Sequence, residues 1–149
     1  MLEAVGRRDE AANLADTLLA LWRDSGPAAA SFWAADLSFV LAPLGLGDAL
    51  VAAARGVRAQ TRWLDAATAF VSGEPLRAAG IYADVGARPE EALALLHAAA
   101  AAEKAGRDNE VEAGLARALA FHRKVGATAY VRDAEASAVG EATRGSAPD

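Results

Sequence analysis

Two stretches of the chain follow one pattern at a separation of 100 residues. Residues 6–26 align with residues 106–126: glycine stands at both ends of each stretch, and Leu19 and Leu119 occupy equivalent positions. Each stretch has room for one helix between two turns. A helix this short buries its apolar face by stacking on neighbours, as in helical repeat proteins. The pattern therefore predicts a stack of helices that offers a surface to partners.

Composition favours the same class. Alanine occupies 42 of the 149 positions and has the highest helix propensity of the residues, so we expect an all-α protein. There is no cysteine, which excludes disulfide bonds and thiolate metal sites. The net charge is −5 and the arginines are scattered singly among acidic residues, a pattern that argues against a nucleic-acid surface.

Glycines and prolines divide the chain into short amphipathic segments. We predict helices over 8–24, 27–41, 48–55, 58–71, 75–85, 89–105, 108–125 and 128–139. Residues 43–47, which include Pro43, are predicted to form a turn. Short connections favour consecutive antiparallel helix pairs in a right-handed stack. We expect one repeat domain over 1–139 and a flexible tail over 140–149, which lacks large apolar residues.

The segment 27–47 is apolar enough to require a comparison with membrane helices. It carries a single charge, Asp36, which would lie near the middle of a bilayer, and Pro43 interrupts the run. We expect this segment to be a helix buried on most sides within the stack. Neither a membrane nor a nucleic acid is predicted as a partner.

Few residues suggest chemistry. His97 and His122 are the only histidines, and neither has the spacing of a metal site or a nearby acidic partner in sequence, so we expect both to pack or to face a partner. Glu90 and Glu91 fit the first turn of a helix, where the helix dipole favours acids. We predict no catalytic residue, no metal ligand and no cofactor. The remaining candidates are Arg55, Arg58 and Arg62, expected to be solvated, and Trp22, Trp33 and Trp63, expected to be core residues that could also line a groove.

The glycines expected within helix pairs are Gly6, Gly47, Gly73 and Gly106. Their mean spacing is close to the roughly 34-residue tetratricopeptide period, although the individual intervals are unequal. The chain thus resembles a degenerate tetratricopeptide array. Ala99 stands where that motif places a small residue against the second helix.

Residues 63–67, 81–92 and 118–131 are similar to the C-terminal repeats of large actinobacterial signalling proteins. Those proteins join an adenylate-cyclase-type or LuxR-type domain to an AAA/STAND-type ATPase and a tetratricopeptide-like tail. The resemblance implies a cytoplasmic sensory or scaffold tail. The ATPase phosphate-binding motif GxxxxGK[ST] does not occur in this sequence.

The helix predicted at 8–24 has more apolar surface than one neighbouring helix can cover. We expect its exposed edge to bind a protein partner or a second copy, through Leu14, Leu18, Leu21 and Trp22. Gly6 would then separate the two helices of a pair, which suggests that the chain is the C-terminal end of a longer array or a shortened gene. The predicted function is a non-catalytic protein-interaction scaffold. An alternative is a regulatory module that senses a small ligand in a concave groove, and an unrecognised enzyme is a third possibility.

Overall fold

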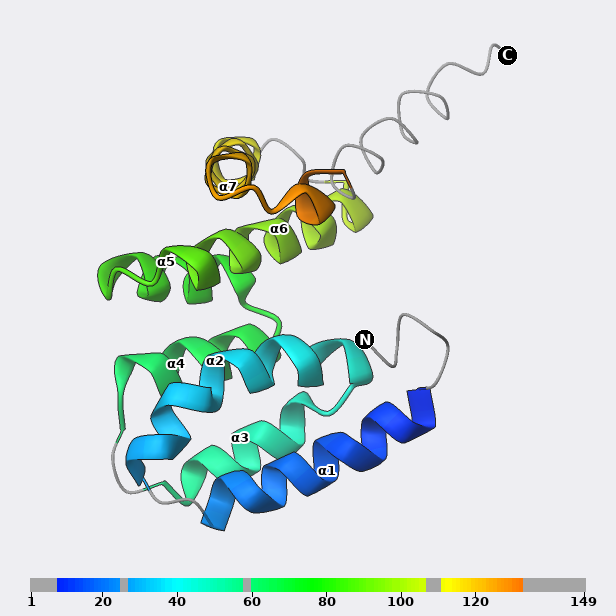
Figure 1. Cartoon of the computed structure of the whole chain (residues 1–149), viewed down its shortest axis with the longest axis vertical. Coiled ribbons are helices and arrows are strands. Elements are labelled where there is room, and N and C mark those ends of the chain that lie inside the picture. The colour runs from blue at the N-terminus through cyan, green and yellow to red at the C-terminus, as the bar shows by residue number, and fades with distance from the viewer. Residues whose placement is uncertain (1–7, 25–26, 58–59, 107–110, 133–149) are drawn as a thin grey trace. The chain divides into compact units, whose positions relative to one another are not determined.

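The protein is described here by a computed structural model, which places residues 8–24, 27–57, 60–106 and 111–132. Every regular element in those ranges is helical, which confirms the all-α class. The helices are α1 (Arg8–Asp24), α2 (Pro27–Leu44), α3 (Gly47–Arg55), α4 (Arg62–Val71), α5 (Pro75–Asp84), α6 (Arg88–Lys104) and α7 (Glu112–Lys124), and residues 128–132 are also helical (Figure 1). None of the helices in these ranges is long and apolar enough to cross a membrane.

The chain divides into two compact units, Met1–Ala94 and Leu95–Asp149, and the boundary falls within α6. The predicted single repeat domain over 1–139 and the predicted tail over 140–149 both stay predictions, since residues 133–149 lie outside the described part of the chain.

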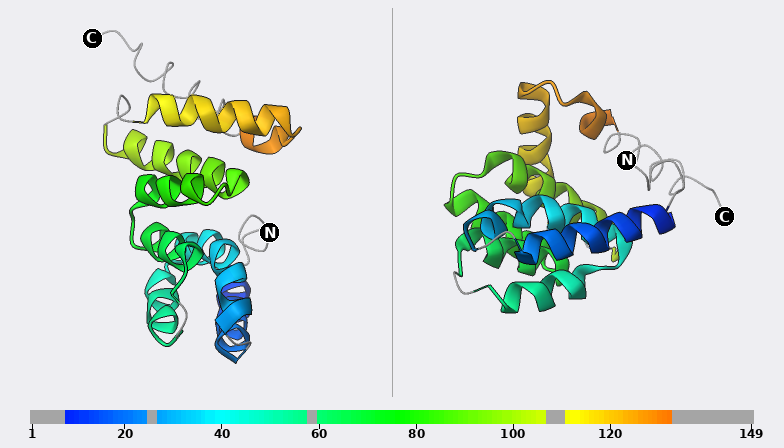
Figure 2. Two further views of the ribbon diagram at one scale, coloured as in Figure 1. Left: turned by 90° about the vertical axis from the view of Figure 1, so that its left-hand side faces the viewer. Right: turned by 60° about the horizontal axis from the view of Figure 1, so that its bottom comes forward.

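In the first unit, α2 and α4 are the central helices. Helix α2 packs against α1, α3 and α4, while α4 packs against α2, α3 and α5, and α1 also touches α3 (Figures 1 and 2). The helices share one apolar cluster. Its buried members are Ala15, Leu19, Trp22, Ala34, Leu37, Leu41, Leu50, Ala54, Leu64 and Ala67.

Glycine ends several of the helices in one recurrent way. At the end of α4, Gly73 has φ of 81°, its N–H donates to the carbonyl of Phe70 at 3.1 Å, and the Glu74 N–H donates to that of Ala69 at 3.0 Å. These bonds occupy carbonyls that the helix leaves unpaired, and the left-handed φ they require is easiest for glycine. Positive φ recurs at Gly45, Gly73, Gly86, Gly106 and Gly126, whereas Gly6 and Gly26 lie outside the described residues.

Three predicted helix boundaries were wrong. One is the start of α7, which was expected at 108 but is Glu112, with Val111 as the N-cap. Helix α2 was expected to end near Leu41, but it continues to Leu44 with Pro43 inside its last turn. Proline lacks an N–H, but in the last turn this removes only one hydrogen bond from the helix. The helix end is closed by the Leu46 N–H, which donates to the Leu41 carbonyl at 3.0 Å. Helix α4 begins later than expected, at Arg62, because the Thr61 side chain caps it by accepting from the Leu64 N–H at 3.3 Å.

The second unit contains the end of α6, α7 and the helical residues 128–132. Its core is built from small side chains: Ala98, Ala102 and Val111 are buried, and Ala99 packs against them as expected. The two helices are close at Gly114, where an added Cβ would lie 2.9 Å from Cδ2 of Leu95. Small residues therefore let α6 and α7 pack closely.

Candidate functional site

Helix α1 carries a row of exposed leucines. Leu14, Leu18 and Leu21 are 54%, 47% and 60% exposed. Their spacings of four and three residues are those of side chains on one face of a helix. The same alternation of four and three forms the contact seam of a coiled coil, so the face has the geometry with which another helix interdigitates. We call these three residues the leucine strip.

The neighbouring face of α1 fixes the helix to the first unit. Ala15, Leu19 and Trp22 are buried there, and they belong to the same apolar cluster as Leu41 and Leu50. Trp22 is 4% exposed, so the prediction that it belongs to the exposed edge was wrong. It lies three residues after Leu19, on the face that packs inward, and its large ring contributes to the core.

Acidic side chains surround the leucine strip. Asp9, Glu10, Asp16 and Asp24 are all exposed on α1. Asp9 and Glu10 lie in the first turn, where the helix dipole favours them, whereas Asp24 is the last residue of the helix, where the dipole disfavours it. The strip is therefore an apolar row with acids at both ends.

The other two tryptophans differ in their environment. Trp33 is 57% exposed, which contradicts its predicted place in the core, while Trp63 is half-buried and its ring centroid lies 5.9 Å from that of Tyr82. Helix α2 instead buries Ala34, Leu37, Ser38 and Leu41. Helix α2 packs against α1, α3 and α4, and Trp33 lies outside the side that these helices cover.

An aromatic cluster that the sequence did not reveal joins α2, α4 and α5. The Phe39 and Phe70 rings meet edge to face with centroids 4.6 Å apart, and Tyr82 lies 6.2 Å from Phe39. The Tyr82 side chain is fully buried, and burial raises the pKa of Tyr82 to about 12. The nearby Ser38 hydroxyl acts in the opposite direction and lowers the pKa of Tyr82. Ser38 donates its own hydrogen bond to the Ala35 carbonyl at 2.7 Å, and the Tyr82 hydroxyl has no hydrogen-bond partner. Burying a hydroxyl without a hydrogen-bond partner costs free energy, so this aromatic cluster packs the core but includes one unfavourable polar group.

The two histidines lie in different surroundings. His122 on α7 is buried, neither ring nitrogen has a hydrogen-bond partner, and its ring centroid lies 4.7 Å from that of Tyr130. Burial lowers the pKa of His122, which favours the neutral ring. His97 on α6 is exposed. The structure thus places His122 in an apolar environment, as expected of a packing histidine.

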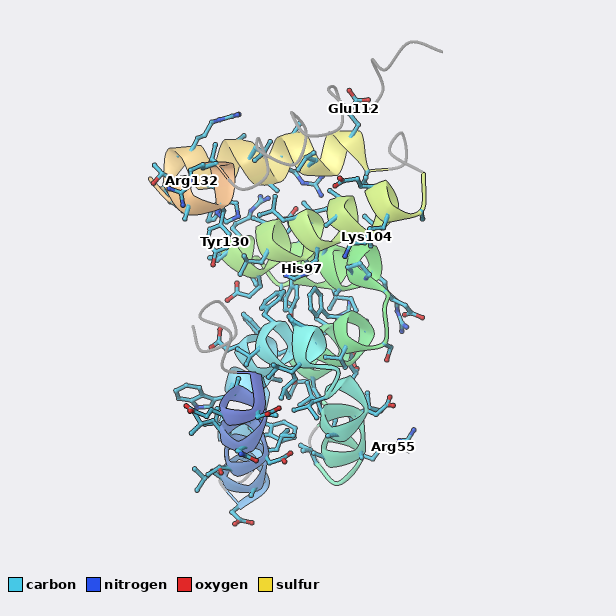
Figure 3. The ribbon with its side chains drawn as sticks, turned by 90° about the vertical axis from the view of Figure 1, so that its right-hand side faces the viewer. Arg55, His97, Lys104, Glu112, Tyr130 and Arg132 are labelled. Atoms are coloured by element: carbon cyan, nitrogen blue, oxygen red, sulfur yellow. The ribbon has the colours of Figure 1, made fainter. Side chains whose placement is uncertain are left out.

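Two of the charged candidates, Arg62 and Glu91, form ion pairs. Arg62 meets Asp84 at 2.9 Å between α4 and α5, and Arg88 meets Glu91 at 3.2 Å in the first turn of α6. Arg55 is exposed at the end of α3 (Figure 3), and Arg58 lies outside the described residues. Among the placed residues, no group of three His, Asp or Glu side chains could hold a metal ion.

Comparison with protein-family models, curated proteins and solved structures finds no significant match to this chain.

Proposed function

We propose that this protein is a non-catalytic protein-interaction scaffold and that its contact surface is the leucine strip of α1. The observation that carries the proposal is the exposure of Leu14, Leu18 and Leu21 in one row. Single exposed leucines are common on protein surfaces, but a row of them on one helix face indicates a site that another apolar surface covers.

The strip is also held rigidly. Leu19 and Trp22 fix the neighbouring face of α1 in the core of the first unit, so the row is already formed before a partner arrives. A preformed surface spends less conformational entropy on binding than a loop that must order. Binding through the leucine strip needs apolar contact and no reactive group, so the proposed function includes no catalytic residue.

The packing of the first unit supports a tetratricopeptide-like arrangement. In such a stack, a helix touches its own partner and also the next helix but one along the chain. Helix α2 packs against both α3 and α4, and α1 packs against both α2 and α3. Together with the sequence resemblance, this pattern favours the regulatory tail, or the free-standing remnant, of an ATPase-type signalling protein in the cytoplasm.

A comparison of two glutamate variants tests the proposal. Leu18→Glu introduces a charge into the strip, and Leu76→Glu is the matched control at an exposed leucine of α5 in the same unit. Immobilised wild type and Leu76→Glu should retain the same protein or second copy, while Leu18→Glu should lose it. If all three immobilised proteins retained the same amount of the bound protein, the leucine strip would not be the contact surface.

A further inference from the structure

A second exposed apolar surface lies in the other unit. Val125, directly after α7, is 55% exposed, and Tyr130 in the helical residues 128–132 is 46% exposed. Exposed basic residues are near both in sequence: Lys124 directly precedes Val125, and Arg132 lies two residues after Tyr130. Tyr130 and Arg132 are labelled in Figure 3. We call this surface the basic end; its residues are Arg123, Lys124, Val125, Tyr130 and Arg132.

The leucine strip and the basic end are complementary. Each combines exposed apolar side chains with a net charge, and the net charges are opposite: α1 has four acidic residues against Arg8 and Arg23, whereas residues 121–132 have three basic residues and no acid. Complementary charge beside an apolar contact fixes its register and speeds encounter. The surfaces lie on different compact units of the chain.

Pairing of two leucine strips lacks this complementarity, because α1 has four acidic residues against Arg8 and Arg23 and both copies therefore carry a net charge of the same sign. Like charges opposite one another cost free energy. The C-terminal sequence 133–149 holds Val139 as its one large apolar residue, so its composition does not match three leucines.

We propose that the occupant of the leucine strip is the basic end of a second copy of this chain. The inference rests on the proposed function of the strip and names its partner. Two different surfaces meet in this contact, so each copy in a row still has one surface of each kind available. Such heterologous contacts form open chains or closed rings, in contrast to a symmetric dimer.

Sedimentation velocity of the full chain between about 5 and 500 μM, a range that brackets micromolar dissociation constants, tests the inference. Wild type should form a concentration-dependent series of species beyond the dimer. Leu18→Glu removes the strip and Val125→Glu removes the basic end, and each should weaken association at least about tenfold, equivalent to 1.4 kcal/mol. Leu76→Glu should associate like wild type. Circular dichroism melts of every variant establish that the helices remain folded.

Mixing the two defective variants gives the decisive measurement. Leu18→Glu retains an intact basic end and Val125→Glu an intact strip, so the mixture should form a one-to-one dimer that neither variant forms alone. A mixture that stays monomeric overturns the head-to-tail contact. If Leu18→Glu alone reduces association, the basic end is refuted as the occupant while the strip remains a contact surface. A wild type that is monomeric throughout the range also refutes this inference, and retention of a different protein by the strip would leave the proposed function intact.

Discussion

A β-carbon on Gly47 would lie 2.8 Å from the backbone oxygen of Val71 and 3.0 Å from its Cβ. The first turn of α3 thus meets the end of α4 with no room for a side chain. Gly47 is buried and its φ is not positive, so the requirement is for space and not for an unusual backbone conformation. Val71 presents backbone at this contact, which cannot move aside as a flexible side chain would.

Gly47→Ala should therefore destabilise the first unit. We expect the free energy of unfolding to fall by about 1–3 kcal/mol, the usual cost of overpacking. Gly80→Ala is the matched control, because Gly80 lies exposed inside α5 with nothing within 4 Å of an added Cβ. That change should raise stability by about 0.5–1 kcal/mol through helix propensity. Urea unfolding followed by tryptophan fluorescence measures both, and a Gly47→Ala protein as stable as wild type would contradict the close contact.

The two faces of α1 should differ sharply in their contribution to stability. Leu19→Ala removes a buried side chain and should cost about 2–5 kcal/mol, whereas Leu21→Ala on the exposed strip should change stability by less than about 0.5 kcal/mol. Urea midpoints of the two variants provide the comparison. Similar costs for the two variants would show that Leu19 does not lie on the face of α1 that packs into the core.

The repeat equivalence predicts a related but smaller effect in the second unit. Leu119 is only partly buried, while Leu19 is buried, so the two aligned leucines match incompletely. Leu119→Ala should cost less than Leu19→Ala and more than Leu21→Ala. Thermal unfolding monitored by circular dichroism orders the three, and a Leu119→Ala cost near zero would refute the equivalence.

Tyr82 should make stability fall at alkaline pH. Its pKa is about 12 in the folded chain against 10.0 for the free group, so the unfolded chain loses this proton first. The contribution is fully present below pH 10 and is lost as pH rises towards 12, by about 2–3 kcal/mol from the two-unit difference. Tyr82→Phe removes both this dependence and a buried hydroxyl that lacks a partner. Urea midpoints at pH 8 and 11 should converge for the variant, and an unchanged alkaline loss would assign the effect elsewhere.

The sequence predicted the helices of this chain well because local signals set their ends. The bounds of α1 agree with the predicted 8–24, and the prolines at 27 and 75 each begin a helix as expected. Glycine C-caps depend on the backbone of one residue, so Gly73 and Gly106 could be placed without knowledge of any tertiary contact. The prediction that α2 ends before Pro43 was wrong because the end of the helix depends on which of its last carbonyls accept hydrogen bonds from the following turn.

Side-chain burial was harder to predict, because it depends on which helix lies opposite. Trp33 and Leu37 are two apolar residues four positions apart on α2, yet one is exposed and the other is buried. The helices that pack against α2 decide between them, and no local pattern encodes those partners. The same limit applied to the site: the exposed leucines of α1 were predicted by residue, but Trp22, one position after Leu21, turns into the core.

His122 should weaken the second unit at mildly acidic pH. Burial lowers the pKa of this ring below 6.5, and neither nitrogen has a hydrogen-bond partner to stabilise a charge. As pH falls through 6.5 the unfolded chain takes up the proton before the folded chain does, so the stability present above 6.5 is lost towards the lower folded pKa. Hydrogen exchange of α7 amides, corrected for intrinsic rates, should show reduced protection at pH 5.2 relative to pH 7.2.

The comparison uses His97→Gln alone and His97→Gln with His122→Leu, so that His122 is the only histidine that differs. Protection should depend on pH in the first protein and should change little in the second, since leucine packs beside the Tyr130 ring without titrating. An equal acid-induced loss in both proteins would show that a carboxylate, and not His122, controls the opening of α7.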